Sequence, residues 1–179
     1  MFVQIEVTPN PNSLKFIPGK IVSNGGPFEI TKNDNVNNEL IRNILSINGV
    51  EGIFLSKEFI SINKSENKSW DEIKHIVISF INEFYASGKE FVINKNLNEQ
   101  NENLDEIEQK IVQLLEEKIR PAVARDGGDI KFKEFKDGVV KVQLQGSCSG
   151  CPSSTMTLKQ GVQNLLCHYL PEVKQVIAV

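Results

Sequence analysis

The sequence predicts an α+β protein made of two small domains, each with a small mixed or antiparallel sheet packed against two helices. Segments with apolar residues at alternate positions, typical of strands, occur beside longer segments with the period of amphipathic helices. An almost wholly polar stretch at 96–103 is typical of a linker and separates residues 1–95 from residues 104–179. The length of 179 residues is enough for two domains of this size.

The pattern in the first domain indicates strands and two helices. Its predicted strands lie at 3–7, 14–17, 52–55, 59–62 and 91–93. A short helix over 40–47 stops at Gly49, and a second helix begins at Ser69, which forms a capping-box sequence with Glu72. This second helix carries one apolar stripe and stops near Gly88. No catalytic cluster of side chains is evident in this domain.

The second domain has the predicted order α-β-β-α-β. Its elements are a helix from 104 to about 124, a turn at 126–129, strands at 130–135 and 139–144, a helix through 158–169 and a strand at 173–177. Pro121 is expected to bend the first helix or to end it earlier. The Asp137-Gly138 pair predicts the hairpin turn between the two strands.

Composition and charge argue against several functional classes. The formal net charge is −3 and no block of Lys and Arg stands out, so we expect no nucleic-acid binding. No segment approaches the roughly 18 consecutive apolar residues of a membrane helix, so we expect no membrane association. Residues 1–7 begin at once in strand-like alternation and lack the features of a signal peptide or an Arg-rich presequence. A cytoplasmic protein is expected.

Two cysteines, Cys148 and Cys151, lie between a predicted strand and a predicted helix. Backbone N–H groups and the macrodipole at the start of a helix favour anionic sulfur, which binds soft metals or attacks disulfides. Gly146 and Gly150 allow backbone angles that turn N–H groups toward sulfur and leave room for a bulky inorganic group. An iron–sulfur cluster usually takes four sulfur ligands, whereas one chain offers two here, so a metal site would be shared between chains.

The other candidate metal ligands have simpler interpretations. Cys167 is expected on the side of its helix opposite Leu158, and about 22 Å past Pro152 at the helical rise of 1.5 Å per residue. It is therefore interpreted as a bystander, and the same distance applies to His168. His75 lies beside the apolar stripe of the 70–84 helix and is interpreted as a packed or surface histidine.

Charged residues near the cysteines also allow two interpretations. Asp126 and Asp129 provide only two carboxylates for a hard metal ion, fewer than a calcium site needs, and a role in the turn or in capping a helix explains them equally well. Arg120, Arg125 and Lys159 either lend positive potential to an anionic cluster or are solvated surface charges.

Several motifs resemble a known family. Residues 119–121, 126–130 and 144–154 are similar to the carboxyl-terminal domain of the NifU and Nfu family, and this resemblance covers nearly all of residues 104–179. Residues 8–16 and the segment from Gly49 to Ile60 resemble the Nfu amino-terminal domain. The separate scaffold cysteines and the ferredoxin-like cysteine set of full-length NifU are absent from this sequence, which therefore looks like the two-domain Nfu type.

The resemblance implies an iron–sulfur cluster scaffold or carrier rather than an enzyme. In this family, paired cysteines of two subunits hold a [4Fe–4S] cluster, and a [2Fe–2S] cluster is the other possibility. The implied ligands are Cys148 and Cys151. The implied partners are a second copy of the chain when the cluster is bound, upstream assembly factors and apo iron–sulfur proteins. Partner recognition is a hypothesis for the amino-terminal domain.

Two alternatives use the same cysteine pair. A thiol–disulfide oxidoreductase also places Cys-x-x-Cys after a strand and at the opening of a helix, although the βαβ pattern expected around that motif is not predicted in the second domain. The other alternative is structural zinc shared across a dimer.

Overall fold

A computed structural model describes residues 2–90 and 103–179, and only the backbone of residues 152–154. The chain divides into two compact units, Met1–Leu97 and Asn98–Val179. The predicted strand at 91–93 and all of the predicted linker except Asn103 lie outside the described residues. The α+β class predicted from the sequence is confirmed.

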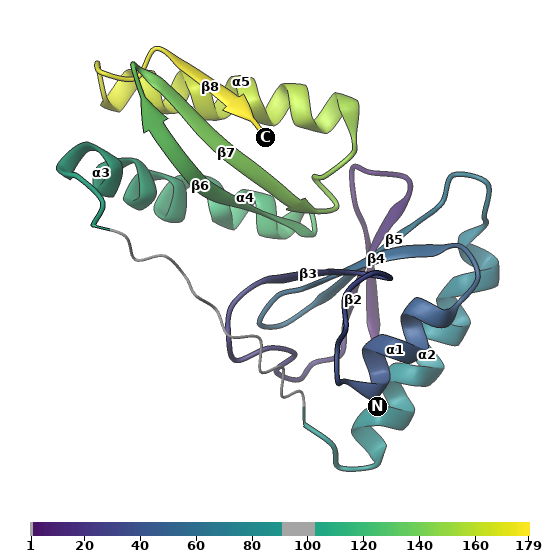
Figure 1. The fold of residues 1–179 in the computed structure, drawn as a ribbon. Coiled ribbons are helices and arrows are strands. Elements are labelled where there is room, and N and C mark those ends of the chain that lie inside the picture. Colours follow the sequence, from purple (N-terminus) through teal and green to yellow (C-terminus); the bar gives the residue numbers. More distant parts are fainter. Residues whose placement is uncertain (1, 91–102) are drawn as a thin grey trace. The chain divides into compact units, whose positions relative to one another are not determined.

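The first unit contains a five-stranded antiparallel sheet of order β1-β2-β5-β4-β3. The strands are β1 (Gln4–Val7), β2 (Ser13–Ile17), β3 (Phe28–Thr31), β4 (Val50–Leu55) and β5 (Ile60–Lys64). Helices α1 (Glu39–Ser46) and α2 (Trp70–Ala86) lie side by side and enclose an apolar core with the sheet (Figure 1). Asn38 and Ser69 cap the two helices, because their side-chain oxygens accept hydrogen bonds from backbone N–H groups of the first turn.

Two features of the first unit differ from the prediction. β3 was not predicted, although Phe28 and Ile30 alternate with Glu29 and Thr31 as strand residues do. It pairs with β4, and Ile30 lies opposite Ile53 in the register. Val7 was expected in a half-buried strand, yet its side chain is 85% exposed, since β1 is an edge strand of the sheet.

The second unit contains a three-stranded sheet of order β6-β7-β8 with helices on one face (Figure 1). Its elements are α3 (Glu106–Leu114), the π-helical turn η1 (Leu115–Ile119), α4 (Arg120–Arg125), β6 (Gly128–Lys136), β7 (Val139–Gly146), α5 (Pro152–Tyr169) and β8 (Gln175–Ala178). The predicted hairpin is confirmed: Asp137 and Gly138 have φ angles of 52° and 82°, the two positive values of a type I′ turn.

β7, α5 and β8 form a parallel βαβ unit, because β8 pairs with β7 in the parallel direction. The prediction that the second domain lacks a βαβ pattern was therefore wrong. Alternating residues reveal a strand but not its direction relative to a neighbour, which depends on where the chain returns to the sheet. The cysteine loop lies at the carboxyl end of β7, inside this unit.

The helical run at 106–125 contains one wide turn immediately before Pro121. The Arg120 N–H donates to the carbonyl of Leu115, five residues earlier, which is the hydrogen bond of a π-helix. A proline inside a helix lacks an N–H and its ring crowds the carbonyl four residues before it. The wider turn accommodates both effects, so the helix continues to Arg125, close to the predicted end.

Candidate functional site

Cys148 and Cys151 lie in the loop between the end of β7 and the start of α5. Cys151 is the N-cap residue of α5, and its carbonyl accepts the N–H of Thr155 at 2.9 Å. The Thr155 hydroxyl in turn donates to the carbonyl of Cys148 at 3.2 Å. The first turn of α5 therefore holds the backbone of both cysteines.

The amino-terminal part of this loop is held by the turn between α4 and β6. The Ser147 N–H donates to the Gly127 carbonyl at 3.2 Å, and the Ser147 hydroxyl donates to the Asp126 carbonyl. A Cβ on residue 128 would lie 2.6 Å from the Gln145 carbonyl oxygen and 2.8 Å from the Cys148 Sγ. Glycine at 128 is therefore what allows this close approach of β6 to the sulfur.

Both candidate sulfur ligands are covered. Cys148 is 4% exposed and belongs to the hydrophobic core of the second unit, and Cys151 is 6% exposed. Burial raises the pKa of Cys148 to about 11, because desolvation disfavours the thiolate. The hydrogen bond with Ser147 acts in the opposite direction, and the charges of Asp126, Cys151 and Asp129 raise the pKa further. The expectation of anionic sulfur is wrong for Cys148, which lies in the core before the helix begins.

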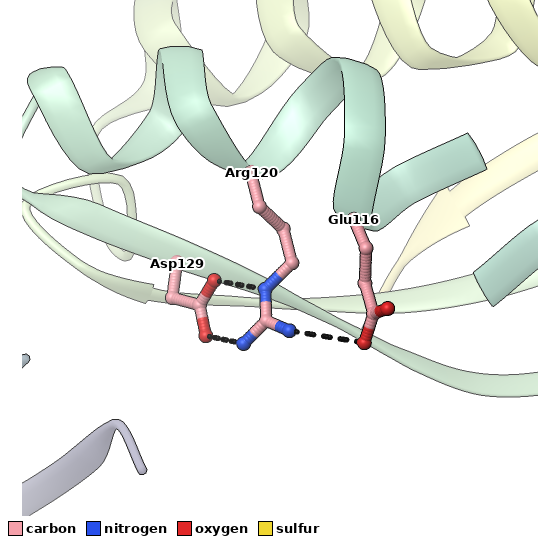
Figure 2. Close-up of polar contacts among 3 residues, drawn as sticks. All are labelled: Glu116, Arg120 and Asp129. Atoms are coloured by element: carbon pink, nitrogen blue, oxygen red, sulfur yellow. Dashed lines mark hydrogen bonds and ion pairs between the residues drawn. The ribbon is translucent and has the colours of Figure 1, made fainter. Parts of the chain in front are cut away.

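A partly buried ion pair joins α4 to β6 (Figure 2). Arg120 Nε and Nη2 donate to the two carboxylate oxygens of Asp129, each at 2.9 Å, and the Asp129 side chain is only 8% exposed. Arg120 Nη1 also donates to Glu116 Oε1 at 3.4 Å. Asp129 follows Gly128 on β6, so this bidentate pair joins α4 to the strand that faces Cys148.

This geometry does not support the hard-metal interpretation of Asp126 and Asp129. Both oxygens of Asp129 are engaged by Arg120, and Asp126 is the C-cap residue of α4. Within 2–90 and 103–179, no group of three or more His, Cys, Asp or Glu side chains is placed to hold a metal ion. The two cysteines are half of the usual ligand set of an iron–sulfur cluster.

Cys167 and Tyr169 depart from the orientation predicted for the last turn of α5. Cys167 is partly buried and packs against the core, whereas Tyr169, predicted on the apolar face, is 51% exposed. The buried Leu166 and Leu170 explain the difference, because the covered side of the helix shifts toward Cys167 at this end. Cys167 remains at the opposite end of α5 from Cys151.

The remaining candidates are dispersed. His75 is exposed on α2 in the first unit, and His168 is exposed and packs edge-to-face on the Tyr169 ring. Arg125 is exposed at the end of α4, and Lys159 is half-buried on α5.

Ser147 was not predicted from the sequence as a residue of the site. Its hydrogen bond to Asp126 joins residues 21 positions apart, and no local sequence pattern indicates such a contact.

Comparison with known proteins matches both units. The family model described as "NifU-like domain" matches residues 111–177, and the model "Scaffold protein Nfu/NifU N terminal" matches residues 3–88. "NFU1 iron-sulfur cluster scaffold homolog, mitochondrial" from Drosophila persimilis is 41% identical over 98% of this chain and 64% of its own length. The human protein of the same name is 42% identical over 98% of this chain and 71% of its own length.

A solved structure shows a more limited likeness. The solution NMR structure of a NifU-like protein from Saccharomyces cerevisiae has 29% sequence identity and a TM-score of 0.48, over 53% of this chain and 86% of the yeast chain. In the described part of the chain, no helix combines the length and apolar character needed to cross a membrane.

The names of the relatives correct one expectation. The relatives from Drosophila and human are named mitochondrial, which contradicts the cytoplasmic location predicted from residues 1–7. That prediction used only the first residues of this chain, and the chain spans 64% of the length of the Drosophila persimilis relative. Both family models and the extended similarity to the human protein agree on the assignment: this chain belongs to the Nfu family of NifU-like proteins.

Proposed function

We propose that this chain is an iron–sulfur cluster scaffold or carrier, and that Cys148 and Cys151 of two copies together hold one [4Fe–4S] cluster as cargo. The observation that carries the proposal is the two-sulfur half-site. Cys148 and Cys151 are joined by one short loop, and the third cysteine of the chain lies at the far end of α5. Four thiolates are the usual ligand set for such a cluster, and a second copy supplies the missing two.

A shared cluster suits delivery to other proteins. Ligands contributed by two chains can be withdrawn by separating the two surfaces, without opening either hydrophobic core. We infer that the cluster passes by ligand exchange to apo iron–sulfur proteins and arrives from upstream assembly factors. The names of the relatives, which call them iron–sulfur cluster scaffold homologs, support this assignment. The first unit is then a candidate for partner recognition.

The βαβ unit favours the thiol–disulfide oxidoreductase alternative, which needs an accessible thiolate near neutral pH. Cys148 is 4% exposed and its pKa is raised to about 11, first by burial. Cluster binding and disulfide exchange both require this sulfur to be uncovered, so its burial does not separate the two functions. The names of the relatives, which are iron–sulfur cluster scaffold homologs, favour the carrier.

Anaerobic reconstitution with iron and sulfide tests the proposal. We expect a brown dimer with about four iron and four sulfide per two chains, and a Mössbauer spectrum of a four-iron cluster. Cys148→Ser and Cys151→Ser should each abolish the cluster, whereas Cys167→Ser is the matched control and should retain it. A Mössbauer spectrum of a two-iron cluster would show that the bound cluster is [2Fe–2S] rather than [4Fe–4S]. Binding of zinc alone would favour the structural-zinc alternative. A normal cluster in Cys148→Ser or Cys151→Ser would reject the proposed ligands.

A further inference from the structure

The position of Cys148 conflicts with what its proposed role requires. A cluster shared between two chains must touch sulfur atoms at a surface. In the metal-free chain Cys148 lies among the buried side chains of the second unit, and its Sγ lies against the backbone of Gly128. The loop must therefore move before this sulfur can reach a cluster.

Ser147 ties the loop that covers the sulfur to the turn between α4 and β6. Its N–H and its hydroxyl both donate to the turn between α4 and β6, to the carbonyls of Gly127 and Asp126. The Ser147 residue is itself 2% exposed. These two hydrogen bonds hold the loop from the side of β6, while Thr155 holds it from the side of α5.

The two ends of the loop have the backbone needed for a pivot. Gly146 and Gly150 have φ angles of 67° and 73°, values that glycine adopts without strain. A Cβ at Gly150 would meet no atom within 4 Å among the residues whose side chains the structure describes. The segment from Ser147 to Ser149 can thus swing outward between two glycines once its hydrogen bonds to the turn break.

We propose that Ser147 is a positioning residue that latches the cysteine loop in a covered state, and that release of this latch exposes Cys148 before a cluster binds. The latch is a property of the metal-free chain, whereas its use in cluster uptake rests on the proposed function. The covered state keeps the thiol inert until a second copy and its cargo arrive.

Site-resolved alkylation of the metal-free full-length chain tests the latch. The chain is treated with iodoacetamide, and the labelling rates of Cys148 and Cys167 are followed by mass spectrometry. In Ser147→Ala we expect Cys148 to react about fivefold faster, the change in opening equilibrium that loss of one hydrogen bond of ~1 kcal/mol produces. The hydrogen bond of Ser147 lowers the pKa of Cys148, so its loss alone would slow the reaction and cannot explain an acceleration.

Three controls separate the latch from general loosening. Ser147→Thr keeps a hydroxyl and should restore the slow rate. Ser149→Ala removes a hydrogen bond of 3.0 Å to the Gly146 carbonyl, which stays within the loop, and should leave Cys148 unchanged. Cys167, at the other end of α5, should react at one rate in all variants. Equal acceleration of Cys148 and Cys167, or a wild-type Cys148 that already reacts as fast as in urea, would overturn the latch.

Cluster uptake provides a second and separate readout. Ser147→Ala should acquire iron and sulfide about fivefold faster than the wild type and reach the same final content, because the same opening precedes binding. An unchanged uptake rate beside faster alkylation would overturn the role of the latch in uptake. Absence of any cluster in the wild type would instead reject the proposed function, and the alkylation result would still decide the latch.

Discussion

The first and second units both pack helices against a sheet, but their cores enclose different chemistry. The hydrophobic cluster of the first unit, within the described residues, is built from aliphatic and aromatic side chains, and buried serines such as Ser13 and Ser61 lie outside that cluster. The core of the second unit also includes the thiol of Cys148. A buried cysteine behaves as a small apolar side chain, so it can fill core space without an unpaired charge. The comparison teaches that the side chain proposed as a cluster ligand also packs as part of a hydrophobic core.

The second unit also has its irregular backbone close to the cysteine loop. The π-helical turn η1 leads into α4, which supplies Arg120 to Asp129 and the turn that binds Ser147. The turns at the end of α4 and after β7 use positive φ angles at Gly127 and Gly146. Departures from regular structure of this kind are typical of functional sites.

The largest expected effect tests whether the two cores are independent. Phe16→Ala empties a fully buried position of the first unit and should lower its free energy of unfolding by about 3–5 kcal/mol. Trp70 is the single tryptophan of the chain and lies in the first unit, so its fluorescence in urea reports this transition. Leu166→Ala, at an equally buried position of the second unit, should leave the Trp70 midpoint unchanged. A common shift in both variants would mean that the units unfold together.

The next effect concerns the ion pair between α4 and β6. Arg120→Leu removes the bidentate partner of the covered Asp129 carboxylate, and we expect the second unit to lose about 2–3 kcal/mol in urea unfolding followed by circular dichroism, less than a fully buried pair because Arg120 is partly exposed. Adding Asp129→Asn should recover part of the loss, because the buried charge is then absent. The control Lys110→Gln breaks an exposed pair with Glu106 and should change stability by less than about 1 kcal/mol. Equal losses for Arg120→Leu and Lys110→Gln would contradict a structural role of the buried pair.

A third effect follows from the covered thiol. The pKa of Cys148 is raised to about 11 from an ordinary value of 9.0, so the unfolded chain loses this proton at a lower pH than the folded chain. Its contribution to stability is complete below pH 9 and falls as pH rises to 11, by about 2–3 kcal/mol. The measurement is the difference in this pH dependence between the wild type and Cys148→Ala, since the other titrating groups are common to both. Parallel curves for the two proteins would show that Cys148 is not covered.

The smallest effect compares two glycines. Gly128→Ala places a Cβ against the Gln145 carbonyl and the Cys148 Sγ, and should destabilise the second unit by about 1–3 kcal/mol. Gly161→Ala is the matched control in α5, where a Cβ meets no atom within 4 Å, and should stabilise the helix by up to about 1 kcal/mol. Urea unfolding measures both. A stable Gly128→Ala protein would mean that β6 and the cysteine loop separate readily.

Much of the fold was predictable because its signals are local. The hairpin at Asp137-Gly138 depends on the backbone freedom of two adjacent residues, and the helix that begins at Ser69 depends on a side chain and the turn that follows it. Periodicity located most strands and helices for the same reason. β3 was not predicted although its residues alternate, and the orientation of Cys167 was wrong because the buried side of α5 shifts near its end.

The candidate ligands were predictable as a pair but not in their state. Spacing and the adjacent glycines predicted a sulfur site at Cys148 and Cys151, and the structure places both residues in the loop between β7 and α5. The start of a helix after the loop predicted anionic sulfur. Burial of Cys148 in the core instead raises the pKa of its thiol, and this burial is not visible in the local sequence. Solvent exposure depends on every neighbour in space, including Gly128, which lies 20 residues away along the chain.

The amino-acid sequence alone predicted the α+β class and placed two cysteines on one loop between a strand and a helix. Three features became visible only in the tertiary structure: β8 runs parallel to β7, Arg120 forms an ion pair with Asp129, and Ser147 holds the loop closed over Cys148. The reason is physical: backbone preference and periodicity act between near neighbours in sequence. Strand direction, burial and ion pairing arise from groups that meet only when distant segments pack together.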